Sequence, residues 1–163
     1  MSFYSAIKRR FAKPRVTIDK YSAPCASYLF PAFYNREENI KRAAARISEC
    51  NLKIDTLVCT GMSGVIFASP LSLFMKTQLV IVRKDSDKNH SHRSIEANCE
   101  PDALGNWIFI DDLIDTGDTQ KRVHTAIKEW VEDDDPEKER VTKYLGHYLY
   151  EDNMLKIEGS DLV

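Results

Sequence analysis

The sequence lacks the features that mark several large classes of protein. No apolar run approaches the roughly 20 residues of a membrane-spanning helix, and residues 1–15 lack the apolar core of a secretory signal. Neither G-x-G-x-x-G nor a P-loop G-K-[ST] occurs. With 23 Lys and Arg against 25 Asp and Glu, the formal net charge is −2. This charge argues against nucleic acid as a partner, because binding along a nucleic-acid backbone favours a clear basic excess.

The four cysteines do not form a zinc or redox motif. Cys25, Cys50, Cys59 and Cys99 are scattered, and none belongs to a C-x-x-C pair. Two of them, Cys50 and Cys59, fall in apolar segments, where a free thiol behaves as a small hydrophobe. We therefore expect a reduced, cytoplasmic protein without structural disulfides.

Strand-like and helix-like segments alternate after residue 35. The strand-like segments are 56–59, 79–82, 107–110 and 141–150. The helix-like segments are 36–50, 64–75 and 118–131. Strands that are apolar on both faces and alternate with helices predict an α/β fold. We expect a single domain, residues 1–163, with a mainly parallel twisted sheet flanked by helices.

The boundaries of these segments follow from local signals. Ser63 is the expected N-cap of the second helix, and Pro70 predicts a kink there or two short helical pieces. The acidic run 132–136 is expected to end the third helix as a solvated linker. Residues 1–35 carry little periodic signal, and residues 83–105 read as a long polar loop. Such loops in compact domains are usually functional or disordered.

The most informative segment runs from Trp107 to Thr119. An apolar strand ends in two carboxylates, Asp111 and Asp112, and a turn rich in Thr, Gly and Asp leads into a helix. Backbone N–H groups at a helix N-terminus bind anions, and Gly117 permits a tight turn. A phosphate pocket beside two acids suits a ribose 5-phosphate, whose hydroxyls or Mg²⁺ the acids would hold.

This segment resembles the phosphoribosyl pyrophosphate (PRPP) binding motif of the type I phosphoribosyltransferases at all thirteen positions, and it looks purine phosphoribosyltransferase-like. The resemblance covers about residues 55–131, the expected PRPP-binding core. It implies a Rossmann-like fold with a small hood, for which residues 141–163 are a candidate.

The resemblance also implies roles for individual residues. The ribose phosphate would lie on Asp115, Thr116, Gly117, Asp118 and Thr119, with Asp118 an unhelpful acid beside a phosphate. Pyrophosphate would be bound by a loop and by a basic pair. The loop consists of Thr60, Gly61, Met62, Ser63 and Gly64, and the pair is Arg83 and Lys84. A flexible lid, 85–103, would contribute Lys88, His90, His92 and Arg93. A base hood would be built either from Tyr144, Tyr148, Tyr150 and Asp152 or from the aromatic residues between Tyr28 and Tyr34. Asp111 and Asp112 would bind Mg²⁺, directly or through water.

The implied reaction transfers ribose 5-phosphate from PRPP to a nucleobase, and the implied partners are PRPP, the base and a second copy of the chain. Asp115 favours a 6-oxopurine acceptor, because an Asp at this place in such enzymes is the proposed base at N7. The segment around Pro70 is instead similar to adenine enzymes, and the conflict stays open. The alternative is a non-catalytic regulatory protein of the same fold that senses PRPP or nucleotides.

Overall fold

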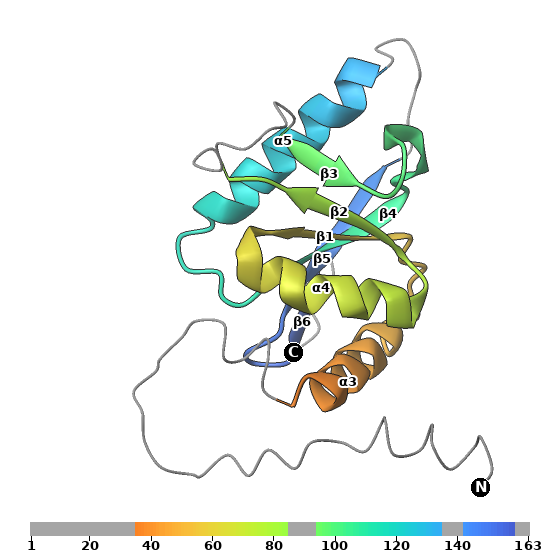
Figure 1. Cartoon of the computed structure of the whole chain (residues 1–163), viewed down its shortest axis with the longest axis vertical. Coiled ribbons are helices and arrows are strands. Elements are labelled where there is room, and N and C mark those ends of the chain that lie inside the picture. The colour runs from red at the N-terminus through yellow and green to blue at the C-terminus, as the bar shows by residue number, and fades with distance from the viewer. Residues whose placement is uncertain (1–34, 85–93, 135–141, 159–163) are drawn as a thin grey trace, which may run out of the picture.

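The computed structural model describes residues 35–84, 94–134 and 142–158 (Figure 1). The strands are β1 (Thr56–Thr60), β2 (Gln78–Val82), β3 (Ile95–Ala97), β4 (Asn106–Asp111), β5 (Lys143–Leu149) and β6 (Met154–Ile157). The helices are α3 (Arg36–Ser48), α4 (Gly61–Met75), the short 3₁₀ helix η1 (Pro101–Ala103) and α5 (Asp118–Asp134).

The six strands form one sheet in the order β3-β2-β1-β4-β5-β6. Strands β2, β1, β4 and β5 are parallel, and the edge strands β3 and β6 are antiparallel to their neighbours. The mainly parallel α/β fold expected from the sequence is therefore confirmed. Helix α4 connects β1 to β2 and helix α5 precedes β5 after β4, and both helices cover the sheet.

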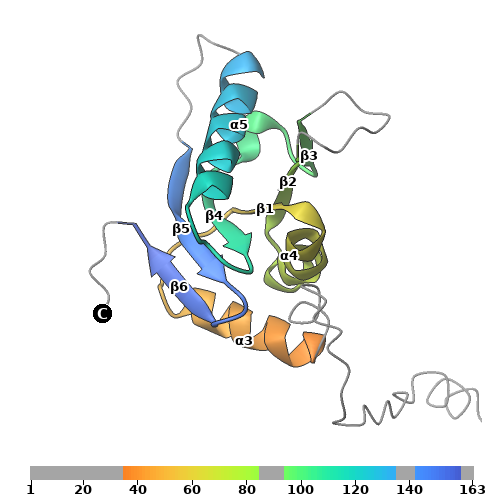
Figure 2. The same cartoon turned by 90° about the vertical axis from the view of Figure 1, so that its left-hand side faces the viewer.

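The helices lie on both faces of the sheet (Figures 1 and 2). One core contains residues of α3 and α4, including Ile47 and Phe67, packed on β1 and β4. The other contains Val123 and Ile127 of α5 packed on the opposite face of the same strands. Strand β1 is buried over its whole length, as expected for a central strand covered on both faces.

Helix α4 begins earlier than the sequence suggested. It starts at Gly61 with Thr60 in the N-cap position, so the assignment of Ser63 as the N-cap was wrong. Pro70 lies inside one helix of 15 residues, and the alternative of two short pieces is also wrong. Burial of this apolar helix between α3 and the sheet offsets the hydrogen bond that a proline removes.

Helix α5 also runs further than expected, to Asp134. The acidic run therefore begins as helix: Glu132 forms an i,i+4 ion pair of 3.7 Å with Lys128, which supports the last turns. No helix in the described ranges is long and apolar enough to cross a bilayer.

Two short strands were missed in the sequence. Residues 95–97 of the expected polar loop form β3, which pairs with β2, and 101–103 form η1. Residues 154–157 form β6, which pairs with β5. Gly146 has φ 148° beside this pairing, and the Lys156 carbonyl leaves no room for a Cβ there. A strand of three or four residues gives too little alternation for detection by periodicity.

Candidate functional site

The two segments expected to bind PRPP meet at one edge of the sheet. Strands β1 and β4 are parallel neighbours, so their carboxyl ends lie side by side. Helix α4 follows β1 directly, and the turn before α5 follows β4; both helices begin at the same edge (Figure 1). The Ser63 hydroxyl donates a hydrogen bond of 3.4 Å to Asp112 and joins the segments. Ligands of open α/β sheets bind at such an edge.

The acid pair at the end of β4 combines a buried and a more accessible carboxylate. Asp111 is 7% exposed, and one of its oxygens accepts the backbone N–H of Asp112 at 3.0 Å. Burial, with the neighbouring Asp112 carboxyl, raises the pKa of Asp111 to about 7, while Lys84 lowers it. Asp112 accepts the backbone N–H of Leu113 at 2.8 Å. The pair therefore concentrates negative charge that a cation or sugar hydroxyls can share.

The turn from Asp115 to Thr119 leads into α5 and is largely open to solvent. Gly117 has φ 79°, and nothing lies within 4 Å of where its Cβ would be. The turn therefore needs a glycine for its backbone and leaves space beside it. Asp118 is the first residue of α5, so the first backbone N–H groups of this helix have no carbonyl partner within the helix. An anion placed there would be favoured by the helix dipole.

Asp118 already occupies one donor of this turn. The Thr116 hydroxyl donates to the Asp118 carboxylate at 2.8 Å, and the Asp118 backbone N–H donates back to that hydroxyl at 3.3 Å. Lys121 lies 3.7 Å from the other carboxylate oxygen. A bound phosphate would have to compete with Asp118 for Thr116.

Residues 60–64, expected to form a pyrophosphate loop, instead end β1 and form the first turn of α4. Gly61 has φ 68°, and a Cβ there would lie 3.1 Å from Cε and 3.3 Å from Nζ of Lys84. The Lys84 side chain thus lies over the start of α4. Met62 is 64% exposed, whereas Ser63 is buried. The turn presents backbone N–H groups and a lysine ammonium, a combination suited to an anion.

Arg83, the other half of the expected basic pair, has a different surrounding. Its side chain is only 14% exposed and lies 3.5 Å from Glu96 of β3. A guanidinium held by a carboxylate is a weaker anion ligand than the exposed Lys84. The expected lid is wrong for residues 95–97 and 101–103, which form β3 and η1. Its four named residues, Lys88, His90, His92 and Arg93, lie outside the described residues.

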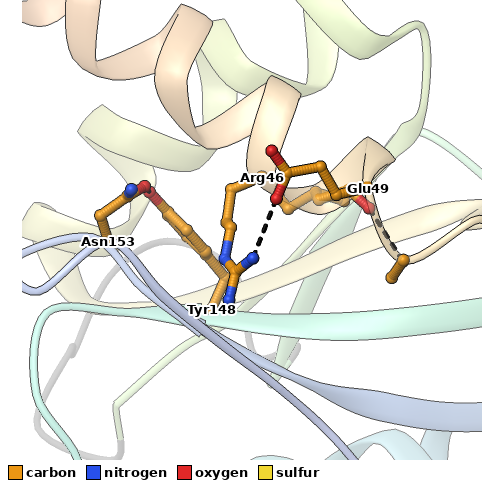
Figure 3. Close-up of polar contacts among 6 residues, drawn as sticks. Arg46, Glu49, Tyr148 and Asn153 are labelled. Atoms are coloured by element: carbon orange, nitrogen blue, oxygen red, sulfur yellow. Dashed lines mark hydrogen bonds and ion pairs between the residues drawn. The ribbon is translucent and has the colours of Figure 1, made fainter. Parts of the chain in front are cut away.

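The tyrosines assigned to a base hood belong to the body of the fold. Tyr148 is 1% and Tyr150 is 3% exposed, and both rings stack on Phe67 of α4, at centroid distances of 6.3 and 4.4 Å. The Tyr148 hydroxyl donates to Asn153 at 2.7 Å beneath α3 (Figure 3). These two assignments were wrong, because rings packed in the core cannot stack on a base. The alternative hood segment, residues 28–34, lies outside the described residues.

The remaining two hood residues lie on β5 and in the turn that follows it. Tyr144 is half-buried, packs 4.7 Å from Trp107 and accepts a hydrogen bond of 2.8 Å from Gln120. Asp152 lies exposed in the turn between β5 and β6. Tyr144 therefore has a packing role. The exposed position of Asp152 does not by itself indicate a role.

The donor set at this edge fits Mg²⁺ held partly by a substrate. Asp111 and Asp112 supply carboxylate oxygens, and no cluster of three or more His, Cys, Asp or Glu suited to a metal occurs in the described part of the chain. Mg²⁺ commonly binds through one or two carboxylates, water and substrate phosphates. Two adjacent carboxylates beside an anion site are consistent with that mode.

Sequence reasoning missed Arg122 of α5. Its guanidinium donates to the Arg83 carbonyl at 2.8 Å and to the Thr60 hydroxyl at 2.9 Å. No local pattern marks this residue, because a single Arg on an amphipathic helix reads as an exposed charge. Only the packing of α5 across the strand ends reveals the contact.

The solved structures that the chain matches include three with low sequence identity to it. They are Leishmania donovani UMP synthase (17% identity, 71% of this chain and 22% of that chain, TM-score 0.49), an adenine phosphoribosyltransferase of Thermoanaerobacter pseudethanolicus (13%, 70% and 83%, TM-score 0.44) and one of Saccharomyces cerevisiae (21%, 72% and 70%, TM-score 0.42). The chain thus spans about a fifth of the Leishmania protein. No curated protein sequence matches the chain.

The family comparison covers more than half of the sequence. Residues 32–130 match the model of the phosphoribosyl transferase domain. That range contains β1, α4 and β2, as well as the acid pair and the turn that opens α5. The chain therefore belongs to the phosphoribosyl transferase domain family.

Proposed function

We propose that the protein transfers the 5-phosphoribosyl group of PRPP to a ring nitrogen of a nucleobase. The C1–O bond to pyrophosphate breaks, and its electron pair leaves with pyrophosphate. A C1–N bond forms, and the nucleobase gives up one ring N–H proton to a general base. One observation carries the proposal: three groups meet where β1 and β4 end. They are the acid pair at the end of β4, the turn at 115–119 that leads into α5, and the start of α4 with the Lys84 ammonium over it.

Each part of this edge has a task in the reaction. The backbone of Gly117 and its neighbours would hold the 5-phosphate, and Asp111 and Asp112 would hold the ribose hydroxyls. Lys84 and the N–H groups at the start of α4 would receive the charge that develops on pyrophosphate, since donors placed where charge develops lower the barrier. Mg²⁺ bound at the two carboxylates would supply further charge neutralisation on the phosphates.

We further propose a purine as the acceptor, with Asp115 as the base. Asp115 is exposed in the turn beside the phosphate site, where its carboxylate is free to meet a ligand nitrogen. The family resemblance places such an Asp at N7 of a 6-oxopurine, whereas the segment around Pro70 is similar to adenine enzymes. The acceptor screen below separates a 6-oxopurine from adenine.

A regulatory protein that binds PRPP without turnover is the second candidate. Two observations favour it: the tyrosines expected over the base lie in the core, and Asp118 holds the Thr116 hydroxyl. Both would leave PRPP binding possible while weakening catalysis. Under this alternative the protein would bind PRPP and release no pyrophosphate with any base.

The test is pyrophosphate release from PRPP and Mg²⁺ with adenine, hypoxanthine, guanine, xanthine, uracil or orotate. We expect release with one purine and formation of the matching nucleoside monophosphate. Asp133→Asn is the matched control, because Asp133 is an exposed carboxylate near the far end of α5. Release only with a pyrimidine would contradict the purine proposal, and PRPP binding without release would favour the regulatory candidate.

A further inference from the structure

Arg122 connects helix α5 to the ends of two parallel strands. It lies just after the first turn of α5 and is half-buried. One terminal nitrogen donates to the Arg83 carbonyl at 2.8 Å, and the other donates to the Thr60 hydroxyl at 2.9 Å. Both distances are typical of charge-assisted hydrogen bonds. The guanidinium therefore donates hydrogen bonds to two separate acceptors at once, which a lysine ammonium cannot reproduce.

The two acceptors belong to a continuous network at the sheet edge. Thr60 is the last residue of β1, and its hydroxyl donates to the Val82 carbonyl at 2.6 Å. Val82 is the register partner of Thr60 and the last residue of β2. Arg83 follows directly, and its backbone N–H pairs with the Ser94 carbonyl at 2.8 Å. Arg122 thus holds the carboxyl ends of β1 and β2 together.

Thr60 and Arg83, the two residues that Arg122 contacts, each come one residue before a proposed pyrophosphate contact. Gly61 follows Thr60 and opens α4, and Lys84 follows Arg83 and lies over Gly61. A shift of either strand end would move the Lys84 ammonium relative to the N–H groups of α4. The guanidinium hydrogen bonds thus go to the ends of β1 and β2, whereas the phosphate turn follows a different strand, β4.

We propose that Arg122 is a positioning residue for the pyrophosphate half of the site. The inference rests on the proposed function, because it assigns Gly61 and Lys84 to pyrophosphate. Arg122 acts by setting the relative position of the two strand ends, and its two terminal nitrogens are already engaged by Arg83 and Thr60. Its loss should weaken pyrophosphate binding selectively and leave ribose 5-phosphate binding intact.

Calorimetric titration of the whole chain with magnesium pyrophosphate and, separately, with ribose 5-phosphate tests this selectivity. For Arg122→Gln we expect pyrophosphate affinity to fall about tenfold, the scale of lost charge-assisted bonds, with ribose 5-phosphate affinity within about twofold of wild type. Arg122→Lys should lose as much, since an ammonium cannot span both acceptors. Lys128→Gln is the control, because it removes one exposed charge from the same helix.

Thr60→Val provides a second measurement should Arg122→Gln fail to fold. It removes one acceptor of the guanidinium with almost no change in volume, and pyrophosphate affinity should again fall while ribose 5-phosphate affinity holds. Unchanged pyrophosphate affinity, equal losses for both ligands, or full recovery by Arg122→Lys would overturn the inference. Wild-type protein that binds neither ligand would instead overturn the proposed function.

Discussion

The Ser63 hydroxyl donates a hydrogen bond of 3.4 Å to Asp112, although 49 positions separate the two residues. The contact joins the first turn of α4 to the acid pair at the end of β4. Because β1 and β4 are adjacent and parallel, this arrangement follows from the topology of the sheet. The groups proposed for pyrophosphate and for ribose consequently share one site.

Replacing Asp112 with Asn should reduce turnover by about 100-fold or more, within the range of a lost catalytic or charge-bearing group. The amide retains the shape of the side chain but not its charge, so the fold should remain. Steady-state pyrophosphate release and a thermal melt check both expectations. Turnover equal to that of the Asp133→Asn control would contradict the role assigned to Asp112.

The pKa of Asp111 predicts a pH-dependent stability. Its ordinary value is about 3.9, and burial raises it to about 7 in the folded chain. Between these values the folded chain retains a proton that the unfolded chain has lost. Stability should therefore fall as the pH rises from about 4 to 7, by at most about 4 kcal/mol, and level off above.

Urea unfolding in EDTA at a series of pH values measures this slope. Asp111→Asn should flatten it and be more stable than wild type at pH 8, while losing ribose 5-phosphate binding. A variant with the same slope as wild type would show that another group causes the pH dependence. A stabilised but inactive variant is expected where function requires a buried charge.

Asp118→Asn should tighten ribose 5-phosphate binding several-fold. The substitution weakens the hold on the Thr116 hydroxyl and removes a negative charge beside the proposed phosphate. The carboxylate is exposed, so solvent screening limits the gain. Calorimetry at low and high salt checks the effect, which should shrink with salt. Affinity that is unchanged at both salt concentrations would mean that Asp118 does not compete with phosphate.

Gly61→Ala should reduce pyrophosphate affinity and cost about 1–3 kcal/mol of stability. The positive φ of Gly61 strains any other residue, and the new Cβ would press on the end of Lys84. Gly64→Ala is the comparison for stability, because its Cβ would meet Cys59 at an ordinary 3.4 Å. Chemical unfolding and pyrophosphate titration measure both effects. Equal stability of the two variants would show that backbone strain at position 61 does not destabilise the fold.

The sequence predicted the central elements well because their signals are local. Strands such as 56–59 and 107–110 are short apolar runs bounded by polar residues, and the helix at 36–50 shows a 3.6-residue period. The positions of the acid pair and of the turn at 115–119, between a strand and a helix, can be read directly from the sequence. Placing them beside residues 60–64 required only the rule that parallel strands end at one edge.

The missed features depend on contacts between distant segments. Strand β3 has three residues and is defined by pairing with β2. Tyr148 and Tyr150 were assigned to a hood because aromatic residues near a chain end suit a base, but packing against Phe67 places them in the core. Arg122 illustrates the same limit, since its role comes from strand ends roughly 40 and 60 positions away.

Titration of the wild-type chain with PRPP and Mg²⁺ tests the central claim most directly, because both the transferase and the regulatory candidates require this binding. We expect one PRPP per chain, with binding abolished or greatly weakened in Asp112→Asn and retained in Asp133→Asn. No detectable binding of PRPP by the folded wild-type chain, or equal binding by the two variants, would contradict the assignment of this sheet edge as a PRPP site.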